Sequence, residues 1–145
     1  MQLNTKKALA YLQKDFSKNW GNLDFSYTQV DKDEAKVTAE VTLNGFDDDI
    51  SLVINVYGGG TAQFRAVFDK LAINADTLAL LNQFNDSNPF FKAFIRNDGY
   101  LELAHFISCY SEDIFKHYGN EFLYRILDLQ ESEALKELSA LTVSE

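Results

Sequence analysis

The sequence predicts an α+β fold, in which helices pack on one face of a mostly antiparallel sheet in the order α-ββββ-α-ββ-α-α. Three observations support this prediction. Apolar and polar residues alternate repeatedly between residues 23 and 68, glycine-containing turns separate the alternating segments, and segments with a period near 3.6 residues stand towards both ends of the chain. Each element therefore has one apolar face, and a layered domain buries such faces against one another.

The size and composition of the chain predict a single domain over residues 1–145. Of its 145 residues, 46% are hydrophobic and 14% aromatic, which is enough apolar material for a sizeable core. The formal net charge is -9. A negative field argues against nucleic acid or an anionic membrane as a partner, whereas a basic protein remains compatible with it.

Three features predict a cytoplasmic protein. The N-terminal segment has neither the long apolar run nor the small-residue cleavage site of a signal peptide. No stretch approaches the roughly 20 apolar residues of a membrane span. Cys109 is the only cysteine, so it has no partner for an internal disulfide.

The first element is predicted to be a helix over residues 5–20. Its apolar residues recur at helical spacing and share one face, and Asn4 or Thr5 can cap its start. The residues of this stripe are Leu9, Leu12, Phe16 and Trp20. Gly21-Asn22 ends the helix.

Four strands follow, at residues 23–30, 35–43, 50–57 and 61–68, and together they predict an antiparallel meander with one apolar and one polar face. Asn44-Gly45 indicates a two-residue hairpin loop, which would pair Ala39 with Ile50 and Val37 with Leu52. The glycines at 58–60 indicate a three-residue loop, which would pair Val56 with Ala62, Ile54 with Phe64 and Leu52 with Ala66.

The next elements are a helix over residues 77–85, capped by Asn74 or Asp76 and broken before Pro89, and then a hairpin. A two-residue loop in this hairpin would pair apolar with polar residues. A three-residue loop at 97–99, with Gly99 in the left-handed conformation, pairs Ile95 with Leu101 and Ala93 with Leu103. It also places Phe91 opposite His105.

Two C-terminal helices complete the prediction. Ser111 is expected to cap a long amphipathic helix whose apolar stripe ends near Leu129. A weaker helix is expected over residues 131–143, where it either docks on the domain or stays partly free.

The second face of the hairpin is the candidate partner or dimer surface. Aromatic residues alternate there with long charged ones, which is a composition typical of interfaces. The residues are Lys92, Phe94, Arg96, Tyr100, Glu102 and Phe106. Three outcomes remain open at this stage: cover by another part of the chain, contact with a partner or a second copy, and ordinary exposure.

No pattern predicts a catalytic residue, a metal ligand set or a cofactor. The glycines at 58–60 lack the lysine and following helix of a phosphate loop, and the acidic clusters at 31–34 and 47–49 are typical of solvated turns. His105 and Cys109 are four residues apart on a strand, about 13 Å, which is too far to hold one ion. His117 falls on the next helix.

Two asparagines precede Pro89 at helical spacing. Asn82 and Asn85 are expected to satisfy backbone groups at the helix end, or to anchor a ligand or a neighbouring strand.

The run LLNQFNDSNPFFKAFIRNDGYLELAHFISC, followed by an amphipathic helix, resembles the YbjN family. The resemblance covers residues 76–129 and consists of a helix with an Asn-x-x-Asn-like element, a strand, a turn with Asp-Gly, a second strand and a helix. That family is similar in fold to the type III secretion chaperones, to which the strand at 61–68 would be an addition. The resemblance implies a non-enzymatic, often dimeric, protein-binding module and no catalytic residue.

The leading functional hypothesis is therefore a non-enzymatic, cytoplasmic, protein-binding or chaperone-like regulatory domain, with a homodimer as one form. Two alternatives differ in kind. One is an acidic inhibitor or immunity-type protein that neutralises a basic partner through charge complementarity. The other is a small-molecule-binding domain or weak enzyme with a pocket between helix and sheet.

Overall fold

The computed structural model describes residues 4–108 and 112–141, and only the backbone for residues 112–114. Within these residues the chain forms an α+β fold with the predicted order of elements. The elements are α1 (Thr5–Asn19), β1 (Ser26–Asp31), β2 (Glu34–Val41), β3 (Ile50–Tyr57), β4 (Thr61–Lys70), α2 (Ala75–Ser87), β5 (Lys92–Ile95), β6 (Tyr100–Ser108), α3 (Glu112–Asp128), a 3₁₀ turn η1 (Leu129–Glu131) and α4 (Glu133–Ser139).

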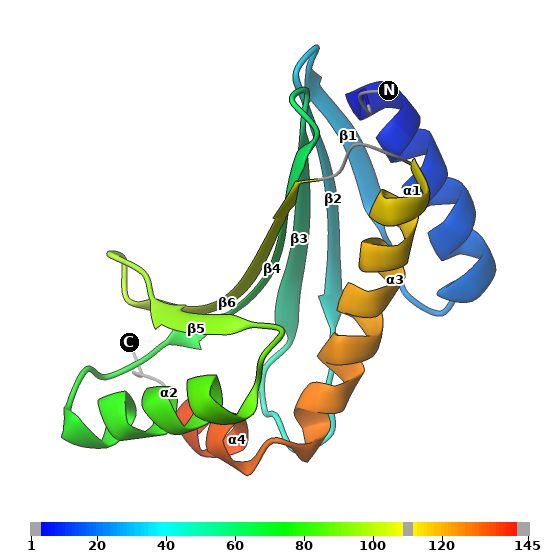
Figure 1. The fold of residues 1–145 in the computed structure, drawn as a ribbon. Coiled ribbons are helices and arrows are strands. Elements are labelled where there is room, and N and C mark those ends of the chain that lie inside the picture. The colour runs from blue at the N-terminus through cyan, green and yellow to red at the C-terminus, as the bar shows by residue number, and fades with distance from the viewer. Residues whose placement is uncertain (1–3, 109–111, 142–145) are drawn as a thin grey trace.

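All six strands belong to one antiparallel sheet, in the order β1-β2-β3-β4-β6-β5. The C-terminal hairpin extends the sheet without continuing the meander, because β6 pairs with β4 and β5, the next strand along the chain, lies at the edge. The pairing shifts between Val67 and Lys70, and here the sheet bends so that β5 and the start of β6 turn away from β1–β3 (Figure 1).

The helices lie on one side of this bent sheet (Figure 1). α1 and α3 cover the strands β1–β4, while α2 and α4 lie together beneath β5. One continuous apolar core fills the space between helices and sheet. Its largest fully buried side chains include Phe16 from α1, Phe64 from β4, Phe84 from α2, and Phe115 and Phe122 from α3.

Two of the predicted registers are confirmed. β3 pairs with β4 as expected, with Ile54 opposite Phe64. In the C-terminal hairpin, Ala93 lies opposite Leu103 and Ile95 opposite Leu101. Gly99 has a φ of 91°, as a three-residue loop ending in a left-handed glycine requires.

The predicted register between β2 and β3 is wrong by two residues. Ala39 lies opposite Leu52 and not opposite Ile50, because the connection occupies residues 42–49 rather than two residues. Leu43 and Phe46 are buried in the core, and the Asn44 amide donates to Gln130 Oε1 at 2.8 Å. These contacts hold the connection on the C-terminal segment, and the shift of two residues leaves the faces of the strands unchanged.

The ends of the chain follow the prediction in part. Asn4 caps α1 by accepting from the Lys7 amide at 2.8 Å, whereas Leu23 and Phe25 pack on the core without joining β1, which begins at Ser26. α4 docks on the domain through Ala134, Leu135 and Leu138, all of them buried. The predicted cap Ser111 lies outside the described residues. None of the described helices is long and apolar enough to cross a membrane.

Candidate functional site

The face of the sheet opposite the helices is the candidate site, and we call it the open face. No described helix covers it, and the bend in the sheet places it on the inside of the curve (Figure 1). Its side chains form three rows across the strands. The rows are Lys36, Asn55, Gln63 and Phe106; then Thr38, Val53, Arg65, Ala104 and Lys92; and then Glu40, Ser51, Val67, Glu102 and Phe94.

A buried carboxylate lies at the centre of the open face. Glu102 is only 5% exposed, and its Oε1 lies 3.5 Å from Arg65 Nη1 and 3.7 Å from Arg96 Nη1. Both arginines are partly open to solvent, which screens these ion pairs. Arg96 also pairs with Asp98 at 2.7 Å. The negative charge of Glu102 is therefore compensated by two neighbouring guanidinium groups, as a buried charge requires.

The network extends across β3 to Glu34 at the start of β2. Arg65 Nη2 donates to Asn55 Oδ1 at 2.7 Å, and Asn55 Nδ2 donates to Glu34 Oε2 at 3.0 Å. Arg65 lies opposite the small residue Ala104, which leaves room for its guanidinium to lie over the strands. Arg65 Nε is buried and has no hydrogen-bond partner among the described residues.

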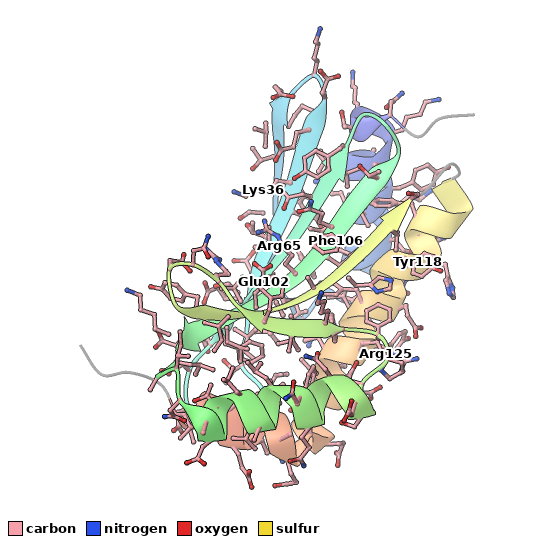
Figure 2. All side chains as sticks on the ribbon, turned by 60° about the vertical axis from the view of Figure 1, so that its left-hand side comes forward. Lys36, Arg65, Glu102, Phe106, Tyr118 and Arg125 are labelled. Atoms are coloured by element: carbon pink, nitrogen blue, oxygen red, sulfur yellow. The ribbon has the colours of Figure 1, made fainter. Side chains whose placement is uncertain are left out.

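Aromatic side chains surround this polar network. Phe106 is 58% exposed, one of the largest apolar exposures in the structure, and it stands on the same face as Lys36, Arg65 and Glu102 (Figure 2). The Tyr100 ring lies beneath two cations, with Lys70 Nζ at 5.4 Å and the Arg96 guanidinium at 5.7 Å from its centroid. The open face therefore combines aromatic area with prearranged charge.

The structure brings the predicted surface residues together on the open face but exposes them unequally. Lys92 and Phe106 are exposed, Phe94, Arg96 and Tyr100 are half-buried, and Glu102 is buried. Arg65 and Asn55 fall on the polar face of the predicted meander. Their contact with the hairpin depends on the pairing of β6 with β4, for which the sequence offers no turn or motif.

His105 is held by aromatic packing at the outer end of β6. Its ring stacks on Phe90 at 4.1 Å, and its Nδ1 lies 2.8 Å from the Phe90 carbonyl oxygen. Tyr118 flanks the imidazole at 5.8 Å, and the guanidinium of Arg125 lies 5.6 Å from the Phe90 ring centroid (Figure 2). These contacts indicate a structural role for His105 in packing β6 against α3.

Among the described residues, the other candidates for metal or catalytic chemistry do not assemble into a site. His117 is exposed, and Cys109 lies outside the described residues. Within the described parts of the chain, no three His, Cys, Asp or Glu side chains are placed to hold a metal ion. The glycines at 58–60 form the β3–β4 turn, and the acidic clusters at 31–34 and 47–49 lie at turns and strand ends.

Asn85 anchors a neighbouring strand, which is one of the roles predicted for it. Its Oδ1 accepts from the Ala93 amide at 2.8 Å, and its Nδ2 donates to the Ala93 carbonyl oxygen at 3.1 Å. The side-chain amide thus takes the place of a further strand beside β5, and it satisfies backbone groups at the edge of the sheet. Asn82 is exposed.

A separate cleft of about 330 Å³ opens between the helix layer and the end of the sheet. Its lining combines apolar side chains with polar groups, and Glu40 is the one charged residue among the described residues that line it. The lining consists of Trp20, Asn22, Leu23, Glu40, Val41, Thr42, Leu52, Leu123, Ile126 and Leu127. Tyr124, 59% exposed, packs edge-on against Trp20 beside the cleft, with ring centroids 4.9 Å apart.

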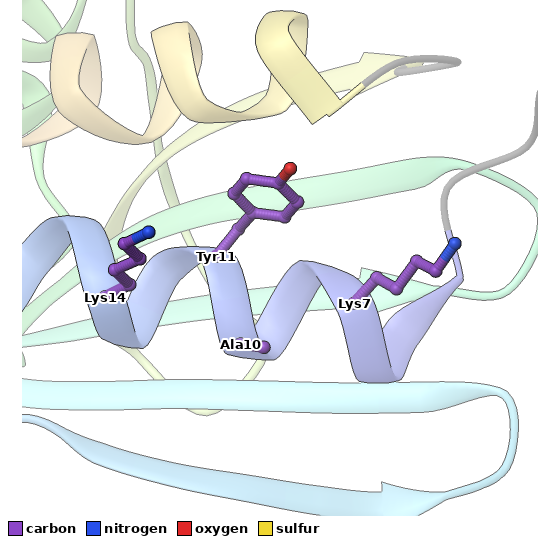
Figure 3. Close-up of a pocket in the computed structure, with 4 residues that line it drawn as sticks. All are labelled: Lys7, Ala10, Tyr11 and Lys14. Atoms are coloured by element: carbon purple, nitrogen blue, oxygen red, sulfur yellow. The ribbon is translucent and has the colours of Figure 1, made fainter.

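The outer side of α1 is basic, unlike the chain as a whole. Lys7, Tyr11 and Lys14 project from the helix towards α3 and line a shallow depression of about 340 Å³ (Figure 3). A second depression lies between the start of α1 and β1, and Lys6 and Lys32 contribute to its lining.

The chain matches no family model, and no curated protein is detectably similar to it.

Proposed function

We propose that this chain is a non-enzymatic, cytoplasmic, protein-binding domain whose open face is the docking surface. One observation carries the proposal: a bent sheet, covered by helices on one side, presents a 58%-exposed phenylalanine beside a preformed ion-pair network on the other. Phe106 supplies apolar area, and the arginines around Glu102 supply oriented hydrogen-bond donors. Aromatic residues and arginine are the residue types enriched in protein interfaces.

The arrangement of charge favours a protein partner over a small anion or cation. Glu102 already faces Arg65 and Arg96, so neither sign predominates at the centre of the open face. A small ion would have to compete with an ion pair that is already formed. A protein surface instead gains from the combined area of apolar contacts and rim hydrogen bonds.

The occupant that we propose for the open face is a second copy of the chain. The face carries Lys36, Arg65 and Arg96 next to Glu40 and Glu102, so acidic and basic groups can meet across a two-fold axis. In such an isologous contact both copies use the same surface patch, and each contact occurs twice, related by the two-fold axis. The net charge of -9 makes two copies repel each other in most orientations. Contact through the open face is compatible with this charge, because that face carries groups of both signs.

A chaperone-like role is supported by the resemblance of residues 76–129 to the YbjN family, because that resemblance implies a non-enzymatic, often dimeric, protein-binding module. The inhibitor hypothesis rests on net charge alone and stays a prediction.

The oligomeric state of two matched variants tests the proposal. Phe106→Asp places a charge in the open face, while Leu78→Asp places the same charge on α2, where Leu78 is 51% exposed. We expect light scattering after size-exclusion chromatography to show a dimer for the wild type and for Leu78→Asp, and a monomer for Phe106→Asp. A wild-type monomer at high protein concentration would overturn the proposed occupant.

A further inference from the structure

We infer that Asn44 is a site of spontaneous deamidation, a covalent modification of the β2–β3 connection that is separate from docking on the open face. Asn44-Gly45 is the only Asn-Gly pair in the chain. Both residues are exposed to water, which is a reactant in this chemistry. The pair lies within residues 42–49, which belong to no strand, so no ladder of hydrogen bonds holds its backbone.

The reaction joins two groups of the same pair. The backbone nitrogen of Gly45 loses its proton to hydroxide and attacks the side-chain carbonyl carbon of Asn44, so that a C–N bond forms. The bond from that carbon to the side-chain nitrogen then breaks, and the nitrogen leaves as ammonia with a proton from water. A water molecule opens the resulting cyclic imide at either of its carbonyl carbons. The product at position 44 is therefore aspartate or isoaspartate.

The turn leaves both reacting groups without hydrogen bonds. The Phe46 amide donates to the Leu43 carbonyl oxygen at 3.2 Å, and Gly45 has a φ of 89°, as the third residue of a type II turn requires. Within the described residues, neither the Asn44 side chain nor the peptide group between Asn44 and Gly45 forms a hydrogen bond. Ring closure requires this peptide group to rotate, and it rotates without breaking one.

Gly45 is required both for the turn and for the reaction. A Cβ at this position would lie 2.8 Å from Lys136 Cε, so glycine is the residue that fits beneath the Lys136 side chain. The missing side chain also leaves the attacking nitrogen open to Asn44. Asn97 provides the contrast, because it is exposed in the β5–β6 turn but is followed by Asp98, whose side chain crowds the corresponding nitrogen.

The modification would act on the contact between the connection and the C-terminal segment. The Asn44 amide donates to Gln130 Oε1, and the flanking Leu43 and Phe46 are buried in the core. Isoaspartate carries the backbone through the former side chain, so it lengthens the chain between these two anchors and adds a negative charge beside Lys136. We therefore expect the isoaspartate form to have a lower melting temperature than the unmodified protein.

Peptide mass spectrometry of the folded protein, after incubation in mildly alkaline buffer, tests the inference. Methylation by an isoaspartyl methyltransferase distinguishes isoaspartate from aspartate at position 44. We expect conversion at Asn44 to be at least about tenfold faster than at Asn97, which is the internal control in the same sample. Asn44→Gln, whose longer side chain would have to close a larger ring, should show almost no conversion.

A second sample, unfolded in urea, separates reaction in the turn from reaction after unfolding. A stable domain is unfolded for about 10⁻³ of the time or less, so conversion in the folded protein within about a hundredfold of the rate in urea means that the folded turn itself reacts. A larger difference, or equal conversion at Asn44 and Asn97, would overturn the inference. Asn44→Asp adds the charge without lengthening the backbone, and its melting temperature should fall less than that of the isoaspartate form. An equal fall would refute the predicted effect of the longer backbone.

Discussion

Phe64 and Arg65 are neighbours on β4, and they show how differently the two faces of this sheet are built. Phe64 is fully buried between the sheet and α3, with its ring 5.4 Å from Phe122 and 6.2 Å from Phe115. Arg65 lies on the open face, where its partners are Asn55 and Glu102. The covered face is held by apolar packing, and the open face by a polar network with partly exposed aromatic residues around it.

Burial on the open face does not require a helix. Glu102 is 5% exposed and Asn55 4% exposed although only neighbouring side chains cover them. Long side chains such as Arg65 and Arg96 lie across the strands and shield polar groups with their own stems. The open face is therefore an ordered surface, and its order is set by hydrogen bonds and ion pairs.

The largest expected effect comes from truncating the covered face. Phe64→Ala should lower the free energy of unfolding by about 3–5 kcal/mol, because it leaves a cavity between β4 and α3. Phe106→Ala removes the same group from the open face, where it is mostly exposed, and should cost less than about 1 kcal/mol. Urea denaturation of both variants measures the difference, and equal losses would refute the distinction between the faces.

The polar network should give the next largest effect. Glu102→Gln removes the charge that faces both Arg65 and Arg96, and we expect a loss of about 1–3 kcal/mol in unfolding free energy. Glu40→Gln is the control, because Glu40 is an exposed carboxylate on the same face. Denaturant titration measures both losses. A loss of unfolding free energy in Glu102→Gln no larger than that in Glu40→Gln would mean that the network does not stabilise the fold.

The edge of the sheet should give a smaller effect. Asn85→Ala removes both hydrogen bonds to Ala93 and should cost about 1 kcal/mol, since water can reach part of the freed backbone. Hydrogen exchange of the Ala93 amide should accelerate in the same variant. Asn82→Ala, at an exposed position of the same helix, should change neither quantity.

The smallest effect concerns Tyr27, on the covered side of β1. Burial raises the pKa of its phenol above the ordinary value of 10.0, and a hydrogen bond with Ser17 offsets part of this rise. Above about pH 10 the unfolded phenol ionises first, so the folded state loses stability as the pH rises through the raised pKa. Tyr27→Phe should remove this part of the alkaline loss, as unfolding curves on either side of pH 10 would show.

The sequence predicts those parts of the fold in which turn chemistry determines pairing. The three-residue loops at 58–60 and 97–99 fix the registers of their hairpins, and both registers are confirmed. The β2–β3 connection could not be predicted in this way. Its conformation depends on Gln130 and on the burial of Phe46, which are contacts that Asn44-Gly45 does not reveal.

In the candidate site, too, local patterns are predictable from the sequence and long-range contacts are not. The alternation of residues from Lys92 to Phe106 predicts which of them share a face. The pairing of β6 with β4 is a contact between segments far apart in the chain, so the meeting of Glu102 with Arg65 required the structure. The cleft lined by Trp20 likewise combines the segment after α1 with β2, β3 and α3, and no single segment marks it.

Site-specific photo-cross-linking tests the proposed role of the open face most directly. A photoreactive phenylalanine analogue replaces Phe106 in one sample and Leu78 in the other, so that the open face and the outer side of α2 are compared in otherwise identical chains. We expect a covalent dimer from position 106 alone, with the cross-linked peptide in β4, β5 or β6 of the second copy. No dimer from position 106, or equal dimer from both positions, would contradict it.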